Sequence, residues 1–279
     1  MLDVLLDSLI DVLKLIPFLF VAFIILEYIE HKLSKKNEKL LVKNKKYGPI
    51  LGGILGAFPQ CGFSAMATKL FSSRVITLGT LIAVYLSTSD EMLPIMISRG
   101  TSLIIVLKII GIKVVIGIIL GLLIDLVYRK KESHKEHIHD ECEQDHCHCE
   151  KGILKSSLHH TINITIYLLI TIIILNTIIY LVGEESIKGF MLNNRAYYIS
   201  SLIGLIPNCA SSVIMTELYL TDMISFGSLM SGLLTGAGVG ILILFKTNKS
   251  IKENIAIIIL LYIIGVIFGY LIDLVGIIV

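Results

Sequence analysis

The stretch FPQCGFSAMATKLF, residues 58–71, places a proline, an amide, a thiol and a serine in the middle of an otherwise apolar run. Proline removes a backbone donor and clashes with the preceding helical turn, so it breaks or kinks a helix. The stretch therefore predicts an interrupted helix. What the interruption can do depends on the solvent that surrounds it.

Composition identifies that solvent. The chain has 279 residues, of which 55% are apolar and 16% charged, and its mean hydropathy of +0.85 implies more apolar surface than one soluble core could hide. Runs such as 9–29, 161–182 and 254–275 reach the roughly 20 residues that a helix needs to cross a bilayer core. We therefore expect an all-α, polytopic membrane protein. The first run has no basic region before it and no small-residue cleavage site after it, so it is expected to be a retained helix.

A second copy of the opening pattern occurs further along the chain. GLIPNCASSVIMTEL at 204–218 places Pro207 and Cys209 148 residues after Pro59 and Cys61. General apolar similarity would not keep one register across proline, cysteine, glycine and aspartate landmarks. The chain is therefore read as an internal duplication.

The ends of the copies keep the same register. LIDLV at 123–127 recurs as LIDLV at 271–275, again without a gap. The sequence thus predicts a first transmembrane repeat at 1–131, a linker at 132–150 and a second transmembrane repeat at 151–279.

Charge predicts how the copies are oriented, because short loops rich in Lys and Arg stay on the cytoplasmic side. The loop 31–47 holds seven lysines, whereas its counterpart 183–195 holds one lysine and one arginine. In the second copy the loop 246–253 holds three lysines, whereas 98–105 has a single arginine. This alternation is typical of an inverted-topology repeat, with both termini outside and the linker in the cytoplasm.

Inversion requires an odd number of crossings in each copy. The first copy has four apolar runs, at 8–30, 48–72, 75–97 and 101–128. The run 48–72 is interrupted near its middle by Pro59 and Gly62, which leaves two pieces of about ten residues, each long enough for half a bilayer. We expect this run and its counterpart 197–220 to be re-entrant helical hairpins, which leaves three crossings in each copy.

Non-helical backbone inside a membrane is tolerated where it is buried in protein or lines a water-filled cavity. The tips of the hairpins are therefore expected to face a cavity. The second half-helix is expected to begin near Ser64, so that a serine cap and a positive dipole end lie close to Gln60 and Cys61.

The crossing after each hairpin is also interrupted, by LSTSDEMLP at 86–94 and by LTGAGVGI at 234–241. Carboxylates such as Asp90 and Glu91 are rare inside membranes and by default mark an ion pathway, although they could also cap a helix at the interface. Carboxylate, amide and carbonyl oxygens suit a hard or borderline divalent ion, and thiols add softness. The candidate ion-binding residues are Gln60, Cys61, Ser64, Asn208, Cys209 and Ser212 from the hairpins and Ser87, Ser89, Asp90, Glu91 and Thr235 from the broken crossings.

The linker contains HKEHIHDECEQDHCHCEK at 134–151, with five of the eight histidines of the chain. Cytoplasmic thiols stay reduced, so metal binding is expected rather than disulfides. Its candidate metal ligands are His134, His137, His139, Cys142, His146, Cys147, His148 and Cys149. They are too crowded for a zinc-finger fold, and we interpret the segment as a metal-capturing linker on the cytoplasmic side.

The segments FPQCGFSA and GTLIAVYLSTSDE, then IPNCASSV and GSLMSGLLTGAGVG, lie on either side of this linker. In this arrangement the chain resembles the ten-helix heavy-metal exporters, a family whose members are also described as manganese transporters or arsenic efflux proteins. The resemblance covers nearly the whole chain. It implies metal export, and ten helices agree with three crossings and two half-helices in each copy.

Three hypotheses remain open. The first is a secondary transporter that exports a divalent cation by alternating access, in exchange for protons or another ion. Manganese is favoured, and Asp90 and Glu91 are expected to be coordinating or protonatable groups. The second is an efflux permease for arsenite or an organoarsenical that relies on Cys61 and Cys209. The third is a membrane metal sensor or chaperone in which the linker acts and the helices anchor it. An enzyme is not expected, because no nucleophile motif or phosphate loop is present.

The expected partners follow from these hypotheses. They are the transported metal ion, Mn²⁺ foremost, and the lipid bilayer of the cell (cytoplasmic) membrane; no nucleic acid and no resident cofactor are expected, and a homodimer is left open. Lys108 and Lys113 lie within the apolar run 101–128. Either they extend toward the outer face, or the predicted topology is wrong there.

Overall fold

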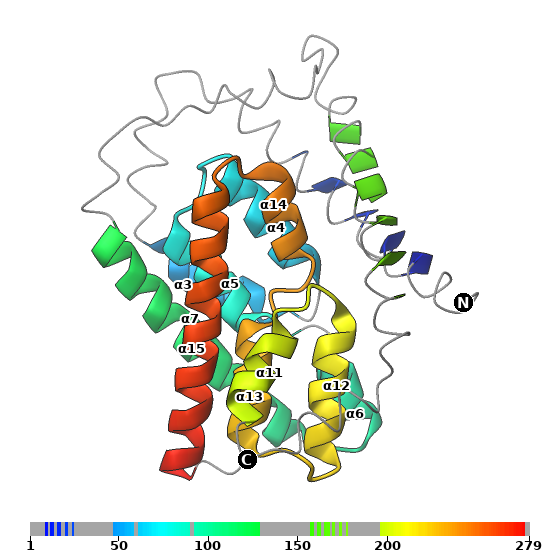
Figure 1. Ribbon diagram of the computed structural model, residues 1–279, viewed down its shortest axis with the longest axis vertical. Helices are drawn as coiled ribbons and strands as arrows, with labels where there is room; N and C mark the ends of the chain where they lie inside the picture. The colour runs from blue at the N-terminus through cyan, green and yellow to red at the C-terminus, as the bar shows by residue number, and fades with distance from the viewer. Residues whose placement is uncertain are drawn as a thin grey trace.

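The computed structural model (Figure 1) describes residues 47–58, 61–89, 92–128 and 196–276, together with isolated helical positions between 9 and 24 and between 157 and 177. In these residues all regular secondary structure is helical. Four helical stretches of the described chain are long and apolar enough to cross a membrane: Leu78–Ser98, Leu103–Tyr128, Phe226–Thr247 and Ile251–Val275. The expectation of an all-α, polytopic membrane protein is confirmed at this level.

Ten continuous helices occupy the described ranges. They are α3 (Gly48–Gly56), α4 (Cys61–Ser72), α5 (Leu78–Ser87), α6 (Met92–Ser98), α7 (Leu103–Tyr128), α11 (Ala196–Gly204), α12 (Cys209–Leu220), α13 (Phe226–Thr235), α14 (Gly240–Thr247) and α15 (Ile251–Val275). Each helix from α11 to α15 begins 148 residues after one from α3 to α7. The helix starts therefore repeat with the offset of the sequence landmarks.

The contacts between helices also come in equivalent pairs. α3 packs against α5 and α7, as α11 packs against α13 and α15. α4 packs against α14, whereas α12 packs against α6, and α5 and α13 contact each other. Because α4 corresponds to α12 and α6 to α14, these contacts are reciprocal, which is the pattern of a two-fold relation between the copies.

α3 runs along α5 in the same direction. A Cβ atom on Gly48 would collide with Thr80 in the first turn of α5, and one on Gly56 would collide with Ser87 at its end. Since α4 ends at Ser72 and α5 begins at Leu78, the start of α3 and the end of α4 lie near the same end of α5. The two short helices thus form a hairpin, while its re-entrant path through a membrane stays a prediction.

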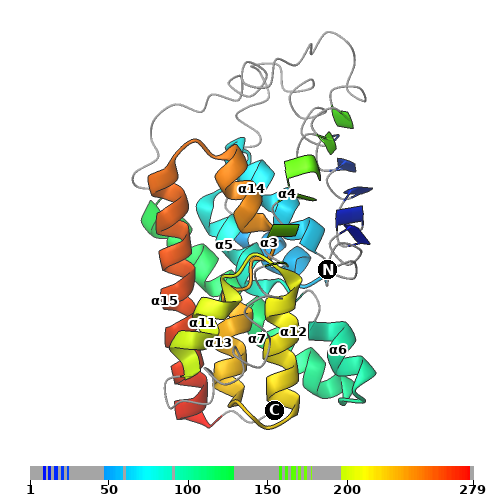
Figure 2. The same cartoon turned by 45° about the vertical axis from the view of Figure 1, so that its right-hand side comes forward.

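The helices are arranged between two ends. α4 and α14 lie at one end and α6 and α12 at the other (Figures 1 and 2). α15 follows directly on α14 and α7 follows on α6, so the two long helices start from opposite ends and run in opposite directions (Figure 1). An inverted-topology repeat would have this arrangement; the inversion relative to a membrane and the boundaries 1–131, 132–150 and 151–279 stay predictions.

Apolar side chains cover the outer faces of the two long helices. Exposed residues follow a helical spacing on both: Leu107, Val115, Ile119 and Leu123 on α7, and Ile255, Ile259, Ile263 and Ile267 on α15. A soluble protein rarely exposes a continuous apolar face of this kind. The pattern is that of helices in contact with lipid.

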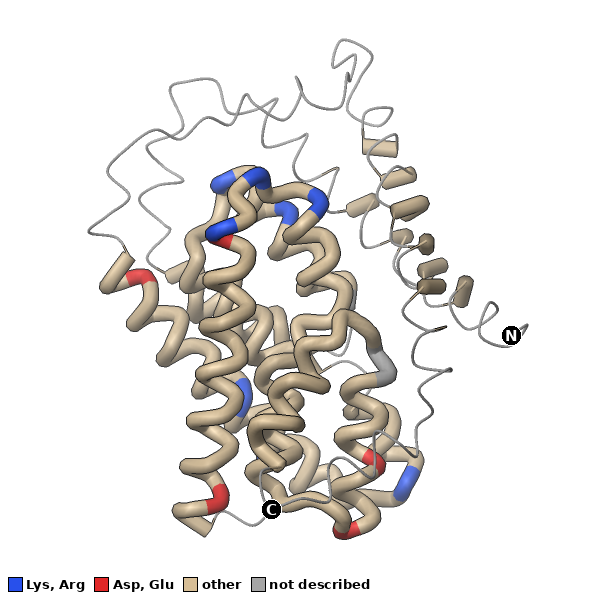
Figure 3. Tube along the Cα trace, viewed as in Figure 1, with Lys and Arg blue, Asp and Glu red and all other residues tan. Residues whose placement is uncertain are grey.

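Charged residues gather at the two ends. Figure 3 shows most of the described Lys and Arg residues at the end formed by α4 and α14, and most of the described Asp and Glu residues nearer the other. The helix ends and loops at the basic end carry Lys69, Arg74, Lys246, Lys249 and Lys252. The described part of the chain is therefore polar at its ends and apolar along its sides.

Candidate functional site

Six of the predicted ion-binding residues have described side chains: Ser64, Ser87, Ser89, Asn208, Ser212 and Thr235. Gln60, Asp90 and Glu91 lie outside the described residues, as do the linker ligands His134, His137, His139, Cys142, His146, Cys147, His148 and Cys149. Cys61 and Cys209 begin α4 and α12, but their side chains are outside the description. The ion-binding roles of all these residues stay predictions.

The second half of the first hairpin begins earlier than expected. α4 starts at Cys61, so Ser64 lies within the first turn of the helix, and its expected role as a cap was wrong. The positive end of the helix dipole therefore lies directly at Cys61.

Ser64 belongs to a buried polar contact between α4, α5 and α14. Its carbonyl accepts a hydrogen bond from Thr68 Oγ1 at 2.6 Å, and Thr68 Oγ1 also lies 2.5 Å from the hydroxyl of Tyr85. Gly240, the first residue of α14, packs on these residues, since a Cβ there would lie 2.9 Å from Tyr85 Cε1 and 3.1 Å from Thr68 Oγ1. The broken crossing of the second copy thus meets the hairpin of the first.

The corresponding region of the second copy is less polar. Asn208 is 5% exposed and lies directly before α12, and the carbonyl of Ser212 accepts from Thr216 Oγ1 at 2.7 Å. Leu233 stands where the first copy has Tyr85, and Met92 where the second has Gly240. The two hairpins therefore differ in the side chains that surround them.

Ser87 and Thr235 occupy equivalent positions at the ends of α5 and α13. Ser87 Oγ donates to the carbonyl of Ala83 at 2.8 Å, and Thr235 Oγ1 lies 2.9 Å from the carbonyl of Gly232. A Cβ on Gly56 would collide with Ser87, as one on Gly204 would with Thr235. Both hydroxyl protons are thus used at helix ends that pack closely, which is a structural role for these two residues.

Sequence reasoning missed the role of Lys113. Lys108 is exposed, but Lys113 of α7 is 0% exposed and does not extend toward the outer face. Its ammonium donates to the carbonyl of Thr88 and, at 2.9 Å, to the carbonyl of Leu233. The signal in the sequence was a lysine in the middle of a 26-residue apolar helix, which by default marks a functional site.

Both carbonyls belong to helix ends. The last carbonyls of a helix lack intrahelical partners and carry the negative end of its dipole. α5 ends at Ser87, with Thr88 as its C-cap, and α13 ends at Thr235, with Gly236 as its C-cap. The breaks in the two crossings therefore present partial negative charge to one shared place inside the molecule.

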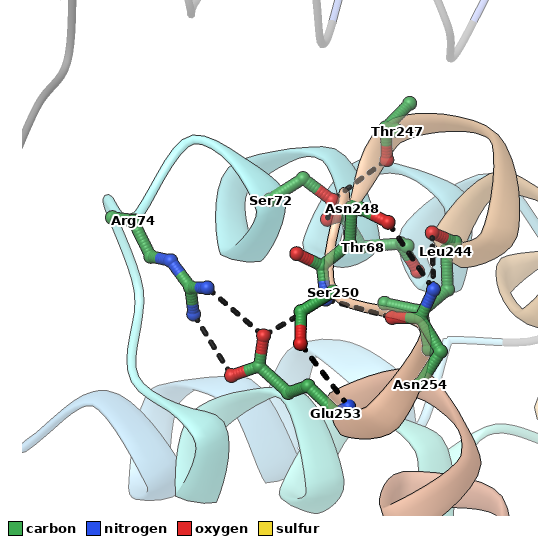
Figure 4. A network of polar contacts seen from close by, with 9 residues as sticks. All are labelled: Thr68, Ser72, Arg74, Leu244, Thr247, Asn248, Ser250, Glu253 and Asn254. Atoms are coloured by element: carbon green, nitrogen blue, oxygen red, sulfur yellow. Dashed lines mark hydrogen bonds and ion pairs between the residues drawn. The ribbon is translucent and has the colours of Figure 1, made fainter. Parts of the chain in front are cut away.

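Ion pairs bind the helices together at both ends of the molecule. Figure 4 shows Arg74, from the loop after α4, in a bidentate ion pair with Glu253 in the first turn of α15. Both N–O distances are 2.9 Å. At the other end Arg99, after α6, lies 2.8 Å from Glu217 of α12. Both pairs connect elements from different copies.

Asparagine side chains extend the first of these contacts into the interior. Asn248 Nδ2 donates to Glu253 Oε2 at 2.9 Å and to Asn254 Oδ1 at 2.7 Å. Asn254 is 0% exposed and donates to the carbonyl of Asn248 at 3.2 Å (Figure 4). Beside them Ser72 Oγ and Thr247 Oγ1 lie 2.6 Å apart, so α4, α14 and α15 form one polar network.

Among the described residues there is no group of three or more His, Cys, Asp or Glu side chains that could hold a metal ion.

A family model described as "Putative, 10TM heavy-metal exporter" matches the chain in two overlapping stretches, residues 1–187 and 150–277. No curated protein and no solved structure matches the chain. The family match agrees with the resemblance carried by the paired proline and cysteine motifs.

Proposed function

Because the chain belongs to the family of ten-transmembrane heavy-metal exporters, we propose that it is a secondary transporter that exports a divalent heavy-metal cation, with Mn²⁺ favoured, by alternating access. The family is one of transporters rather than enzymes. The metal ion is the substrate, and the lipid bilayer is the medium in which the helices act.

The reciprocal packing of α4 on α14 and of α12 on α6 is the observation that carries the mechanism. In many transporters, discontinuous helices from two inverted repeats meet at the substrate site, and one repeat rocks against the other. Here each hairpin packs on the broken crossing of the other copy. Movement of one copy against the other would therefore change both contacts together and open the site to alternate sides.

The choice of a divalent metal rests on the donor types at the breaks. Asp90, Glu91, Gln60 and Asn208 offer oxygen ligands, which suit a hard or borderline ion such as Mn²⁺. A trivalent arsenical binds up to three thiolates, whereas the membrane part offers only Cys61 and Cys209, so arsenite efflux ranks second. A sensor or chaperone ranks third, because an anchor would not need polar breaks within its helices.

The orientation follows from the basic end of the molecule. The end of the molecule formed by α4 and α14 carries most of the described lysines (Figure 3). If this end faces the cytoplasm, both termini lie outside the cell and the linker lies in the cytoplasm. Labelling of single cysteines placed at each terminus and in the linker tests this orientation. Termini protected from an impermeant reagent in intact cells would contradict it.

The function is tested by transport into proteoliposomes that hold the purified protein, with Mn²⁺, Zn²⁺, Fe²⁺ and arsenite compared in one assay. Asp90→Asn removes a charge with little change of shape, so we expect it to abolish metal flux while the protein remains folded. Asp222→Asn is the matched control, because Asp222 is exposed in the loop before α13. Unchanged flux in Asp90→Asn would reject the carboxylate mechanism, and flux of arsenite alone would reject the choice of substrate.

A further inference from the structure

A buried lysine joins the two broken crossings at their helix ends. Lys113 is 0% exposed, and its ammonium contacts the carbonyl of Thr88 and, at 2.9 Å, that of Leu233. These carbonyls come from the C-cap of α5 in the first copy and from the last turn of α13 in the second, and the two helices also contact each other. The ammonium of Lys113 therefore contacts the C-terminal ends of two helices, one from each copy.

The two carbonyls that contact the ammonium have the chemistry of a cation site. Two helix C-termini place partial negative charge there, and their carbonyl oxygens have no intrahelical partners. Rings of backbone carbonyls can replace the hydration shell of a monovalent ion, and half-helix C-terminal ends coordinate Na⁺ in several transporters. The two described contacts are with neutral carbonyls, which suit a singly charged ion.

The lysine comes from one copy only. The residue 148 positions after Lys113 is Leu261 of α15, which is also 0% exposed and carries no charge. The second copy therefore contributes helix-end carbonyls but no ammonium of its own at the equivalent position. A site formed by both copies is filled by a side chain from one of them.

We propose that the ends of α5 and α13 form a binding site for a small monovalent cation, and that the ammonium of Lys113 occupies this site as a tethered substitute for the ion. The intact protein then needs no free monovalent cation at the place where its two broken crossings meet. Removal of the lysine side chain opens the site to K⁺, NH₄⁺ or a primary alkylammonium ion. This inference rests on the contacts of Lys113 and does not depend on which metal is transported.

The test measures thermal unfolding of the purified full-length chain in choline, sodium, potassium, ammonium and methylammonium chloride at equal ionic strength. We expect the Tm of the intact protein and of Lys108→Ala, an exposed lysine on the same helix, to be the same in every salt. Lys113→Ala should unfold several degrees lower in choline and regain stability saturably with K⁺, NH₄⁺ or methylammonium. Lys113→Met, which fills the space without a donor, should unfold at a lower temperature in every salt.

Three outcomes would overturn the proposal. The first is a Tm of Lys113→Ala that is equally low in all five salts. The second is failure of Lys113→Ala to accumulate in membranes, because the K⁺ of the cytosol should fill the site. The third concerns Asp90, which follows Thr88 by two positions and lies outside the described residues. If the double variant Lys113→Met/Asp90→Asn is as stable as the intact protein, the role of the ammonium is to neutralise the Asp90 carboxylate rather than to bind the two carbonyls.

Discussion

At the scale of single residues, the repeated LIDLV motif has a structural role. Asp125 of α7 accepts a hydrogen bond from the backbone N–H of Gly79 at 2.8 Å and from Thr77 Oγ1 at 2.6 Å. Asp273 of α15 makes the equivalent contacts, with Gly227 N at 2.7 Å and with the hydroxyl of Ser225. Each carboxylate thus satisfies an orphan donor in the first turn of a neighbouring helix and lies at the positive end of its dipole.

Asp125→Ala should therefore lower the free energy of unfolding by about 1–3 kcal/mol, because it leaves a partly buried N–H without its acceptor. Asp125→Asn should cost less, since its amide oxygen still accepts one bond. Thermal unfolding of the purified protein measures both, with the exposed Lys108→Ala on the same helix as control. Asp125→Ala variants as stable as that control would contradict the capping role.

Two glycines of α7 should respond in opposite ways to the same substitution. A Cβ on Gly121 would lie 2.5 Å from the carbonyl of Gly79 and 2.9 Å from Ala83 Cβ, whereas one on Gly111 would meet nothing within 4 Å. Gly121→Ala should therefore destabilise the protein by about 1–3 kcal/mol through overpacking. Gly111→Ala should be neutral or stabilise it by up to about 1 kcal/mol through helix propensity. Equal unfolding temperatures for the two variants would show that the close approach of α5 and α7 is not rigid.

At the scale of helices, ion pairs between the copies hold the two ends of the molecule. The Arg74–Glu253 side chains are 39% and 22% exposed, whereas those of Arg99–Glu217 are 61% and 28% exposed. Exposed pairs contribute little because water screens them. The first pair should therefore be the stronger, also because Asn248 supports its carboxylate.

A double-mutant cycle with Arg74→Ala and Glu253→Ala should give a coupling energy of about 1 kcal/mol, and the same cycle on Arg99 and Glu217 a smaller one. The free energy of unfolding of the single and double variants supplies both values. A larger coupling energy for Arg99–Glu217 would mean that the asparagine network in Figure 4 does not strengthen the Arg74–Glu253 ion pair.

At the scale of the whole molecule, the His- and Cys-rich segment 134–150 falls in the sequence between the two predicted repeats. The helices from α3 to α7 and from α11 to α15 pack directly on one another. Deletion of residues 134–150 should therefore leave metal transport intact, while it lowers the apparent affinity or removes regulation by cytoplasmic metal.

Concentration-dependent flux in proteoliposomes, compared between the full chain and the deletion, separates these effects. A variant that replaces the eight linker His and Cys residues by Ser keeps the linker length and serves as control. Complete loss of flux in both variants, with the protein still inserted, would favour the sensor or chaperone hypothesis.

Much of this architecture is determined by the sequence alone. Composition indicates that the protein lies in a membrane, and the 148-residue offset between Pro59 and Pro207 predicts the repeat. Both features can be read directly from the order and type of residues, without knowledge of how the chain folds. The separation of α3 from α4 and of α5 from α6 could also be predicted, since proline and short polar residues act on the backbone next to them. The start of α4 at Cys61 rather than near Ser64 shows the limit of such local reasoning.

Only the tertiary structure decided which of these breaks meet and what lies between them. Lys113 and Leu233 are 120 positions apart, and Ser72 and Thr247 are 175 apart, so no local pattern pairs them. The hydroxyl of Thr235 donates to the carbonyl of Ser201 in α11 at 3.0 Å, which no local pattern predicts, while the ion-binding roles of Ser87 and Thr235 stay predictions. A buried ammonium is stable only beside acceptors that other helices supply, and their identity depends on how the two copies pack.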